Sequence, residues 1–177
     1  FAGWQKVTVP FAAFKNDGGP RLDLAAIHSL KFEVQGGMRR PVLLDQVRLA
    51  CADQVTVTTA ADGGAGSLRK ALGSVCAGGT VSFAPALGGQ TITLTSGPLT
   101  LGKNVTIDGA AAPGLTVSGN NTDLVVIVNS GTTAAVRNLK LANGYGYELA
   151  GGILNNGSLT LDHVVLADNR VTTGGKD

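Results

Sequence analysis

Four aspartates in the second half of the chain are the residues whose type could support cleavage of a polysaccharide. They are Asp108, Asp123, Asp162 and Asp168. Glycosidases use paired carboxylates roughly 5–10 Å apart, and a calcium-dependent enzyme needs clustered acidic ligands. Asp108 and Asp168 stand next to Gly109 and Asn169, where aspartate commonly makes a turn, whereas the adjacent Asp162 and His163 should point to opposite faces of a strand. Because no constellation is evident, we assign no catalytic residue.

Metal and thiol chemistry are equally sparse. His28 and His163 lie in different regions without a partner at metal-ligand spacing, so no metal site is expected at either histidine. Cys51 and Cys76 flank the junction between two regions of different composition. They form either a disulfide in an exported protein or two buried free thiols.

Aromatic residues offer candidates for binding. Tyr145 and Tyr147 belong to a glycine-rich segment, residues 143–148, which we interpret as a loop between two coils. Their spacing places both rings on one side of an extended segment, where tyrosine can stack on sugars or anchor a protein. Alternatively, one or both rings fold over the coil as a cover. With Trp4, they are the candidate contacts for a glycan or another partner.

Asparagines recur shortly after apolar strand patterns, at Asn120, Asn143 and Asn169. Asparagine tolerates the left-handed backbone conformation of tight turns. We interpret these three as structural residues that hydrogen-bond along the axis of a coil.

Composition narrows the class of protein. Charged residues are 15% of the 177 residues and the net charge is +2, so no nucleic-acid partner is expected. The longest aliphatic run, residues 124–128, is too short to cross a bilayer, so we expect no membrane insertion. Residues 1–54 contain one threonine and residues 55–177 contain sixteen, which places a domain boundary at about residues 52–55.

Apolar pairs separated by one residue recur about every two dozen residues in the second region. One column comprises Val81/Phe83, Val105/Ile107 and Val126/Val128. A second comprises Ile92/Leu94, Leu115/Val117, Leu139/Leu141 and Val164/Leu166. Such recurrence is typical of a coil whose successive turns stack to bury a shared core. We therefore predict an all-β fold, a parallel β-helix over residues 55–177.

A short helix should precede the coils. Ser67 can cap it, and Leu68, Ala71, Leu72 and Val75 would share one face. We expect this helix to cover the open end of the stack.

The first region, residues 1–54, has alternating apolar positions typical of antiparallel strands, with Asp45 among the apolar residues of the last one. Residues 3–14, 22–27 and 43–49 resemble the C-terminal half of galactose-binding-like jelly-roll carbohydrate modules. That resemblance implies a partial jelly roll, in which Asp45 would hold a structural calcium ion; hydrogen bonding of Asp45 to nearby backbone is the alternative. No other cofactor is expected.

Residues 62–72, 79–83 and 105–109 resemble the N-terminal cap and first coils of bacterial right-handed β-helix surface proteins, the pectate-lyase-like and polymorphic outer-membrane-protein-like repeats. This resemblance implies a right-handed parallel β-helix and an extracellular or cell-surface location. Because lyases, hydrolases, adhesins and passive scaffolds share the fold, it does not decide the function.

Three functions remain open. The first is a non-enzymatic surface protein, a structural or adhesive stalk or filament subunit whose partners are polysaccharide or other copies of itself. The second is a polysaccharide lyase or glycoside hydrolase, whose active site would lie in coils beyond Asp177 of what we expect to be an excerpt of a longer secreted chain. The third is a pure glycan-binding module.

Overall fold

The structure, a computed structural model, describes residues 51–172. They belong to the second of two units into which the chain divides, Phe1–Val47 and Arg48–Asp177. The predicted jelly roll, with Trp4, His28 and Asp45, lies outside the described residues.

Short strands make up most of the described chain, with one helix near its beginning. The elements of the first turns are β1 (Ala52–Val57), α1 (Leu68–Ser74), β2 (Val75–Phe83), the 3-10 helix η3 (Pro85–Leu87), β3 (Thr91–Thr93), β4 (Leu99–Leu101) and β5 (Val105–Asp108). The middle turns contain β6 (Thr116–Ser118), β7 (Val126–Val128), β8 (Thr133–Arg137), β9 (Lys140–Ala142) and β10 (Tyr145–Tyr147). The last elements are β11 (Ile153–Asn155), β12 (Ser158–Asp162), β13 (Val165–Ala167) and β14 (Arg170–Thr172).

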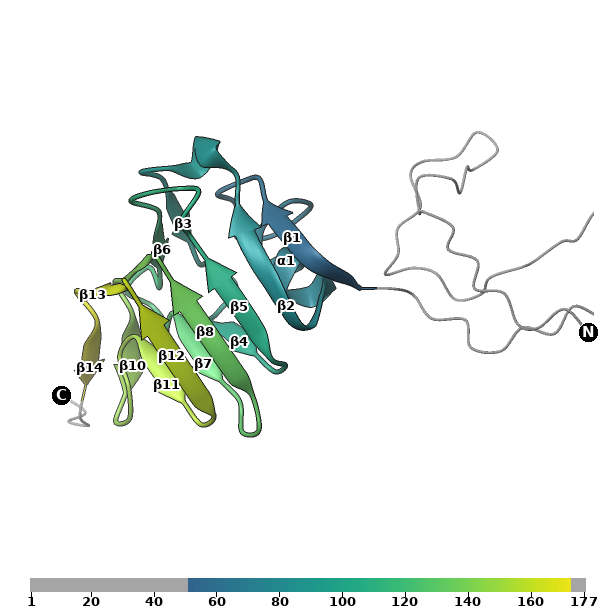
Figure 1. Cartoon of the computed structure of the whole chain (residues 1–177). Coiled ribbons are helices and arrows are strands. Elements are labelled where there is room, and N and C mark those ends of the chain that lie inside the picture. The colour runs from purple at the N-terminus through teal and green to yellow at the C-terminus, as the bar shows by residue number, and fades with distance from the viewer. Residues whose placement is uncertain (1–50, 173–177) are drawn as a thin grey trace, which may run out of the picture. The chain divides into compact units, whose positions relative to one another are not determined.

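The strands form a parallel β-helix of about five turns, as the sequence predicted (Figure 1). The sheets have the orders β1-β2-β5-β8-β12, β3-β6-β9-β13, β4-β7-β11 and β10-β14, and every pair is parallel. Nearly all crossovers between parallel strands are right-handed, and this is the hand that the resemblance predicted for the coil. The chain thus visits three main sheets in each turn and returns one strand further along the stack.

The register of the stack corrects part of the predicted columns. Val81 pairs with Ile107, and Val105 lies opposite Gly79. The pair Val126/Val128 belongs to another sheet, where β7 lies between β4 and β11. Turns between strands differ in length, so a constant repeat cannot identify partners that only backbone hydrogen bonds select.

The second predicted column is correct over three turns. Val117, Leu141 and Leu166 stack in register through β6, β9 and β13. Ile92 pairs with Val117, so the predicted alignment of Leu94 with Val117 is shifted by two residues. Partner residues in this sheet are 24 and 25 residues apart along the chain, which is why a nearly constant repeat identifies them.

The predicted helix is confirmed, and it ends at Ser74, one residue earlier than predicted. Ser67 is its N-cap and its Oγ accepts a hydrogen bond from the backbone N–H of Lys70. Leu68 and Ala71 are buried in the core that β1 and β2 enclose. Val75 is buried as well, but it begins β2 and does not belong to the helix.

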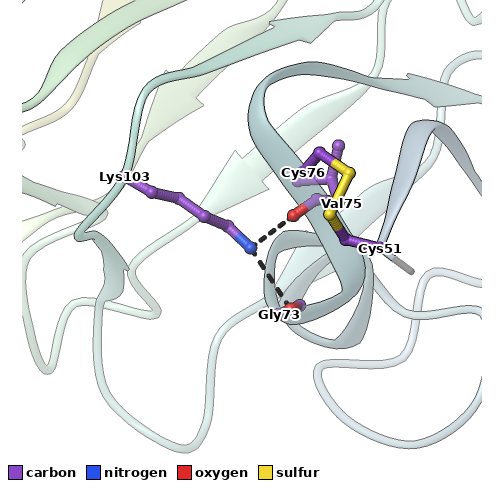
Figure 2. The surroundings of a disulfide bond; sticks show 5 residues. All are labelled: Cys51, Gly73, Val75, Cys76 and Lys103. Atoms are coloured by element: carbon purple, nitrogen blue, oxygen red, sulfur yellow. Dashed lines mark hydrogen bonds between the residues drawn. A yellow bond between two sulfur atoms is a disulfide. The ribbon is translucent and has the colours of Figure 1, made fainter. Parts of the chain in front are cut away.

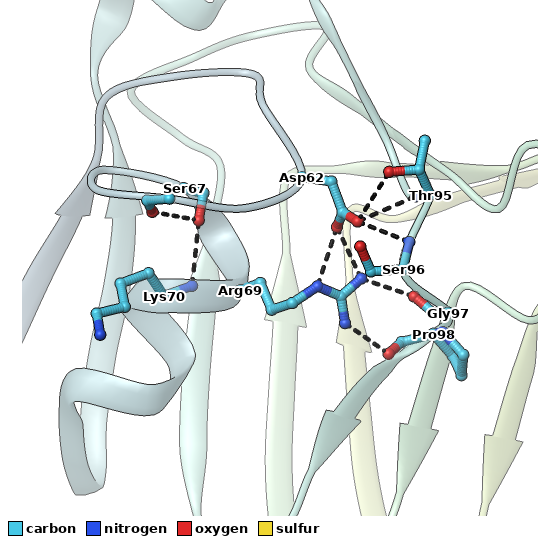
Figure 3. Close-up of polar contacts among 9 residues, drawn as sticks. Asp62, Ser67, Arg69, Lys70, Thr95, Ser96, Gly97 and Pro98 are labelled. Carbon is cyan, nitrogen blue, oxygen red and sulfur yellow. Dashed lines mark hydrogen bonds and ion pairs between the residues drawn. The ribbon is translucent and has the colours of Figure 1, made fainter. Parts of the chain in front are cut away.

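Two ties hold α1 and β1 to the first turns. Asp62, in the loop before α1, pairs with Arg69 at 2.7 Å and also accepts hydrogen bonds from the backbone N–H groups of Thr95 and Ser96 (Figure 3). A disulfide joins Cys51 to Cys76, the first of the two alternatives that the sequence left open (Figure 2). β1 begins at Ala52, next to this disulfide and ahead of the predicted domain start at residue 55.

Candidate functional site

The two tyrosines lie on a strand and not on the predicted loop. They are the first and last residues of β10, which pairs in parallel with β14. In this register Tyr145 lies beside Arg170 and Tyr147 beside Thr172. The pair of strands therefore carries the tyrosines, an arginine and a threonine on one face.

Gly146 decides which face that is. A Cβ atom on Gly146 would collide with the backbone oxygen of Ala150 and would come within 2.9 Å of a methyl group of Leu124. Position 146 therefore points into packed structure, and its two neighbours must point outward. The exposed fractions, 37% for Tyr145 and 61% for Tyr147, agree with this geometry. Both tyrosine rings therefore point outward, as the first of the two interpretations expects, although Tyr147 is more exposed than Tyr145.

A charged row is a second candidate, because the five-stranded sheet brings two of the four aspartates to one face. Asp108 pairs in register with Arg137, and Arg137 with Asp162. Their neighbours Ile107 and Val136 are buried, so these three side chains lie on the outer face. With neighbouring strands about 4.8 Å apart, the two carboxylates branch from backbone positions roughly 9–10 Å apart.

Asp108 is held as an anion. A hydrogen bond from Asn138 Nδ2 (2.9 Å), another from the backbone N–H of Ala110 (2.9 Å) and the charge of Arg137 lower its pKa, and these effects exceed the opposing effect of burial. The bond to Ala110 also makes the turn that the sequence predicted for this aspartate. With its pKa lowered, Asp108 is unsuited to act as a general acid at neutral pH.

The side chains of Asp162 and His163 meet, contrary to the prediction that they point to opposite faces. His163 Nδ1 lies 2.6 Å from Asp162 Oδ1. β12 ends at Asp162, and His163 has a left-handed backbone with φ of +51°, so the alternation of a strand no longer applies. Both side chains are largely exposed, His163 by 80%.

The other two aspartates stay away from the row. Asp123 accepts a hydrogen bond from the backbone N–H of Leu124 at 2.8 Å, and Asp168 occupies a left-handed turn with φ of +54°. The turn predicted at Asp168 is therefore confirmed. Both residues have local structural roles, and neither belongs to the same sheet as Asp108.

Two of the three predicted asparagines, Asn143 and Asn169, form side-chain hydrogen bonds along the coil axis. Asn143 Nδ2 donates to Ser118 Oγ of the previous turn, and Asn169 donates to the carbonyl oxygen of Leu141 and accepts from the backbone N–H of Gly144. Asn120 has the expected left-handed backbone, with φ of +59°. Asn138, which bonds Asp108, is the contact that sequence reasoning missed; its only signal was its place directly after an apolar strand pattern.

For metal sites and membrane-spanning helices, the structure gives information on residues 51–172 alone. Within them, no group of three or more histidine, cysteine, aspartate or glutamate residues could hold a metal ion, and no helix is long and apolar enough to cross a membrane. Calcium binding through Asp45 and contacts through Trp4 stay predictions, because both residues lie outside this range. Comparison with known protein families, curated proteins and solved structures finds no match for this chain.

Proposed function

We propose that the chain is a non-enzymatic extracellular surface protein, in which the β-helix serves as a structural or adhesive stalk and contacts glycans through the face of β10 and β14. The observation that carries the proposal is the packed position of Gly146, which forces Tyr145 and Tyr147 outward from the side of a rigid stack. Residues two apart on a strand are about 6.8 Å apart, so the two rings form a short platform. Such amphipathic rings stack on sugars at little entropic cost.

An oxidising location fits the covalent structure. The disulfide between Cys51 and Cys76 ties the beginning of β1 to β2. Disulfides persist mainly in secreted and cell-surface proteins. This supports the extracellular part of the proposal, together with the resemblance of residues 62–109 to bacterial β-helix surface proteins.

Polysaccharide binding by the 177-residue chain tests the proposal. We expect retention on at least one of cellulose, chitin, xylan and polygalacturonate, and a loss of about tenfold or more in affinity when Tyr145 and Tyr147 are both changed to alanine. The Tyr145→Phe/Tyr147→Phe variant keeps both rings and should keep most of the affinity. Unchanged binding by the alanine variant, or no retention on any of the four polymers, would contradict the tyrosine face.

The charged row gives a second candidate function, cleavage of a polysaccharide. Two carboxylates flank Arg137 on one outer face, and their backbone positions lie roughly 9–10 Å apart. Inverting glycosidases hold their two carboxyl groups about 6.5–9.5 Å apart, which leaves room for a water molecule. Release of reducing ends or unsaturated products from the same four polymers would support this function. The activity should then disappear in Asp108→Asn and Asp162→Asn and persist in Asp123→Asn, which changes an aspartate outside the row.

A further inference from the structure

A cavity of about 370 Å³ lies between α1 and the turn that follows β4. Leu72 and Gly73 contribute from the helix, and Leu101 and Lys103 from the opposite side. This volume is in the range of small-molecule sites and is far too small for a polysaccharide. None of its lining residues belongs to β10, β14 or the charged row, so the cavity is separate from both surfaces discussed above.

Two cations line this cavity, and their surroundings differ. Arg69 is neutralised by Asp62, and its remaining bonds go to the carbonyl oxygens of Gly97 and Pro98 (Figure 3). Lys103 Nζ donates to the carbonyl oxygens of Gly73 and Val75 at the end of the helix (Figure 2). Among residues 51–172, no carboxylate lies within ion-pair distance of Lys103. One positive charge in the cavity is thus without a counter-charge in this part of the chain.

An ammonium group carries three donors, and the two carbonyl groups use two of them. Within residues 51–172 the third donor makes no hydrogen bond, and Lys103 lines the cavity. Apolar residues nearby lower the local dielectric and strengthen the attraction of Lys103 for an anion. Leu72, which is half-buried, would meanwhile accept an apolar group.

We propose that this cavity binds a small amphipathic carboxylate, with the carboxylate at Lys103 and the apolar body against Leu72. The carbonyl oxygens of Gly73, Val75, Gly97 and Pro98 surround the two cations. Their partial negative charges disfavour a doubly charged phosphate relative to a carboxylate with one charge. The site would couple ligand binding to the attachment of α1, because Lys103 also holds the end of that helix.

Benzoate is a suitable probe, with benzamide as its neutral isostere and inorganic phosphate as the doubly charged comparison. We expect the 177-residue chain to bind benzoate with a dissociation constant on the order of 1 mM, with amide shifts in NMR spectra at Gly73 and Gly102. Benzamide and phosphate should bind at least about tenfold more weakly, because a hydrogen bond to a charged group contributes about 1.5–3 kcal/mol.

Variants separate binding from folding. Lys103→Gln should weaken benzoate binding about tenfold or more, whereas Lys70→Gln removes an exposed lysine outside the cavity and should leave it unchanged. Leu72→Trp keeps Lys103 and fills the cavity, so it should also abolish binding even if Lys103→Gln disturbs the helix. Equal affinity for benzoate and benzamide, no shift at the cavity, or full binding by Leu72→Trp would overturn the proposal.

Discussion

The two ends of the described coil contain similar residues in different environments. Leu141 and Leu166 occupy the same row on neighbouring strands, β9 and β13, yet Leu141 is 2% exposed and Leu166 is 52% exposed. At the other end of the stack, the core residues Val57 and Phe83 are 0% and 1% exposed, with α1 packed nearby. In a stacked coil, burial comes from the neighbouring turn or a cap, and the residue type alone does not decide it.

The ends also differ in how their polar groups are used. At the capped end, Asp62 pairs with Arg69 and bonds the backbone of the first turn, and a disulfide fixes β1. At the last described turn, the pair formed by Asp162 and His163 is local and largely exposed. Contacts that join separate segments stabilise the fold more than an exposed pair between adjacent residues.

Truncating the two stacked leucines tests this difference most strongly. Leu141→Ala should lower the free energy of unfolding by about 2–5 kcal/mol, because it leaves a cavity between two turns. Leu166→Ala should cost less than about 1 kcal/mol, because half of its side chain is already exposed. Urea unfolding of both variants provides the measurement. Equal losses would show that the last turn is as well packed as the middle of the coil.

The disulfide should give the next largest effect, confined to the capped end. Changing Cys51 and Cys76 together to serine should lower the free energy of unfolding by about 2–4 kcal/mol, because the unfolded chain regains freedom. Hydrogen exchange should accelerate in β1 and α1 and stay unchanged in β13. Dithiothreitol should destabilise the native chain and leave the double variant unaffected; insensitivity of the native chain would contradict the assignment.

The ion pair of the cap should give a smaller effect than the disulfide. Burial alone would raise the pKa of Asp62, but hydrogen bonds from Arg69, Thr95 and Ser96 outweigh it and lower the pKa from 3.8 to about 2. The resulting stability is present above pH 3.8 and is lost as the pH falls through about 2. Asp62→Asn should cost about 1 kcal/mol at neutral pH and flatten this acid dependence.

Asp162→Asn is the matched change at the other end. Because its histidine partner is adjacent and exposed, the stability at neutral pH should be unchanged within error. Chemical unfolding between pH 2 and 7 compares the two variants on one scale. A larger loss for Asp162→Asn than for Asp62→Asn would reverse the order of the two ends.

The sequence by itself determined the local features of this protein. The recurrence of apolar pairs predicted a parallel coil, Ser67 marked the start of the helix, and the row from Val117 to Leu166 was assigned in the correct register. The left-handed turn at Asn143 and the turn at Asp108 also followed from residue type. These features depend on neighbours within a few residues or on a nearly constant spacing along the chain between successive strands of one sheet.

Only the tertiary structure decided how distant segments meet. It placed Val126 in a third sheet, aligned Asp108 with Arg137 and Asp162, and turned the segment around Gly146 into a strand paired with β14. The loops between strands vary in length, so register depends on backbone hydrogen bonds between turns, which carry no local signature. The same reason explains why two leucines in one row differ so widely in burial: the neighbouring turn supplies the contacts.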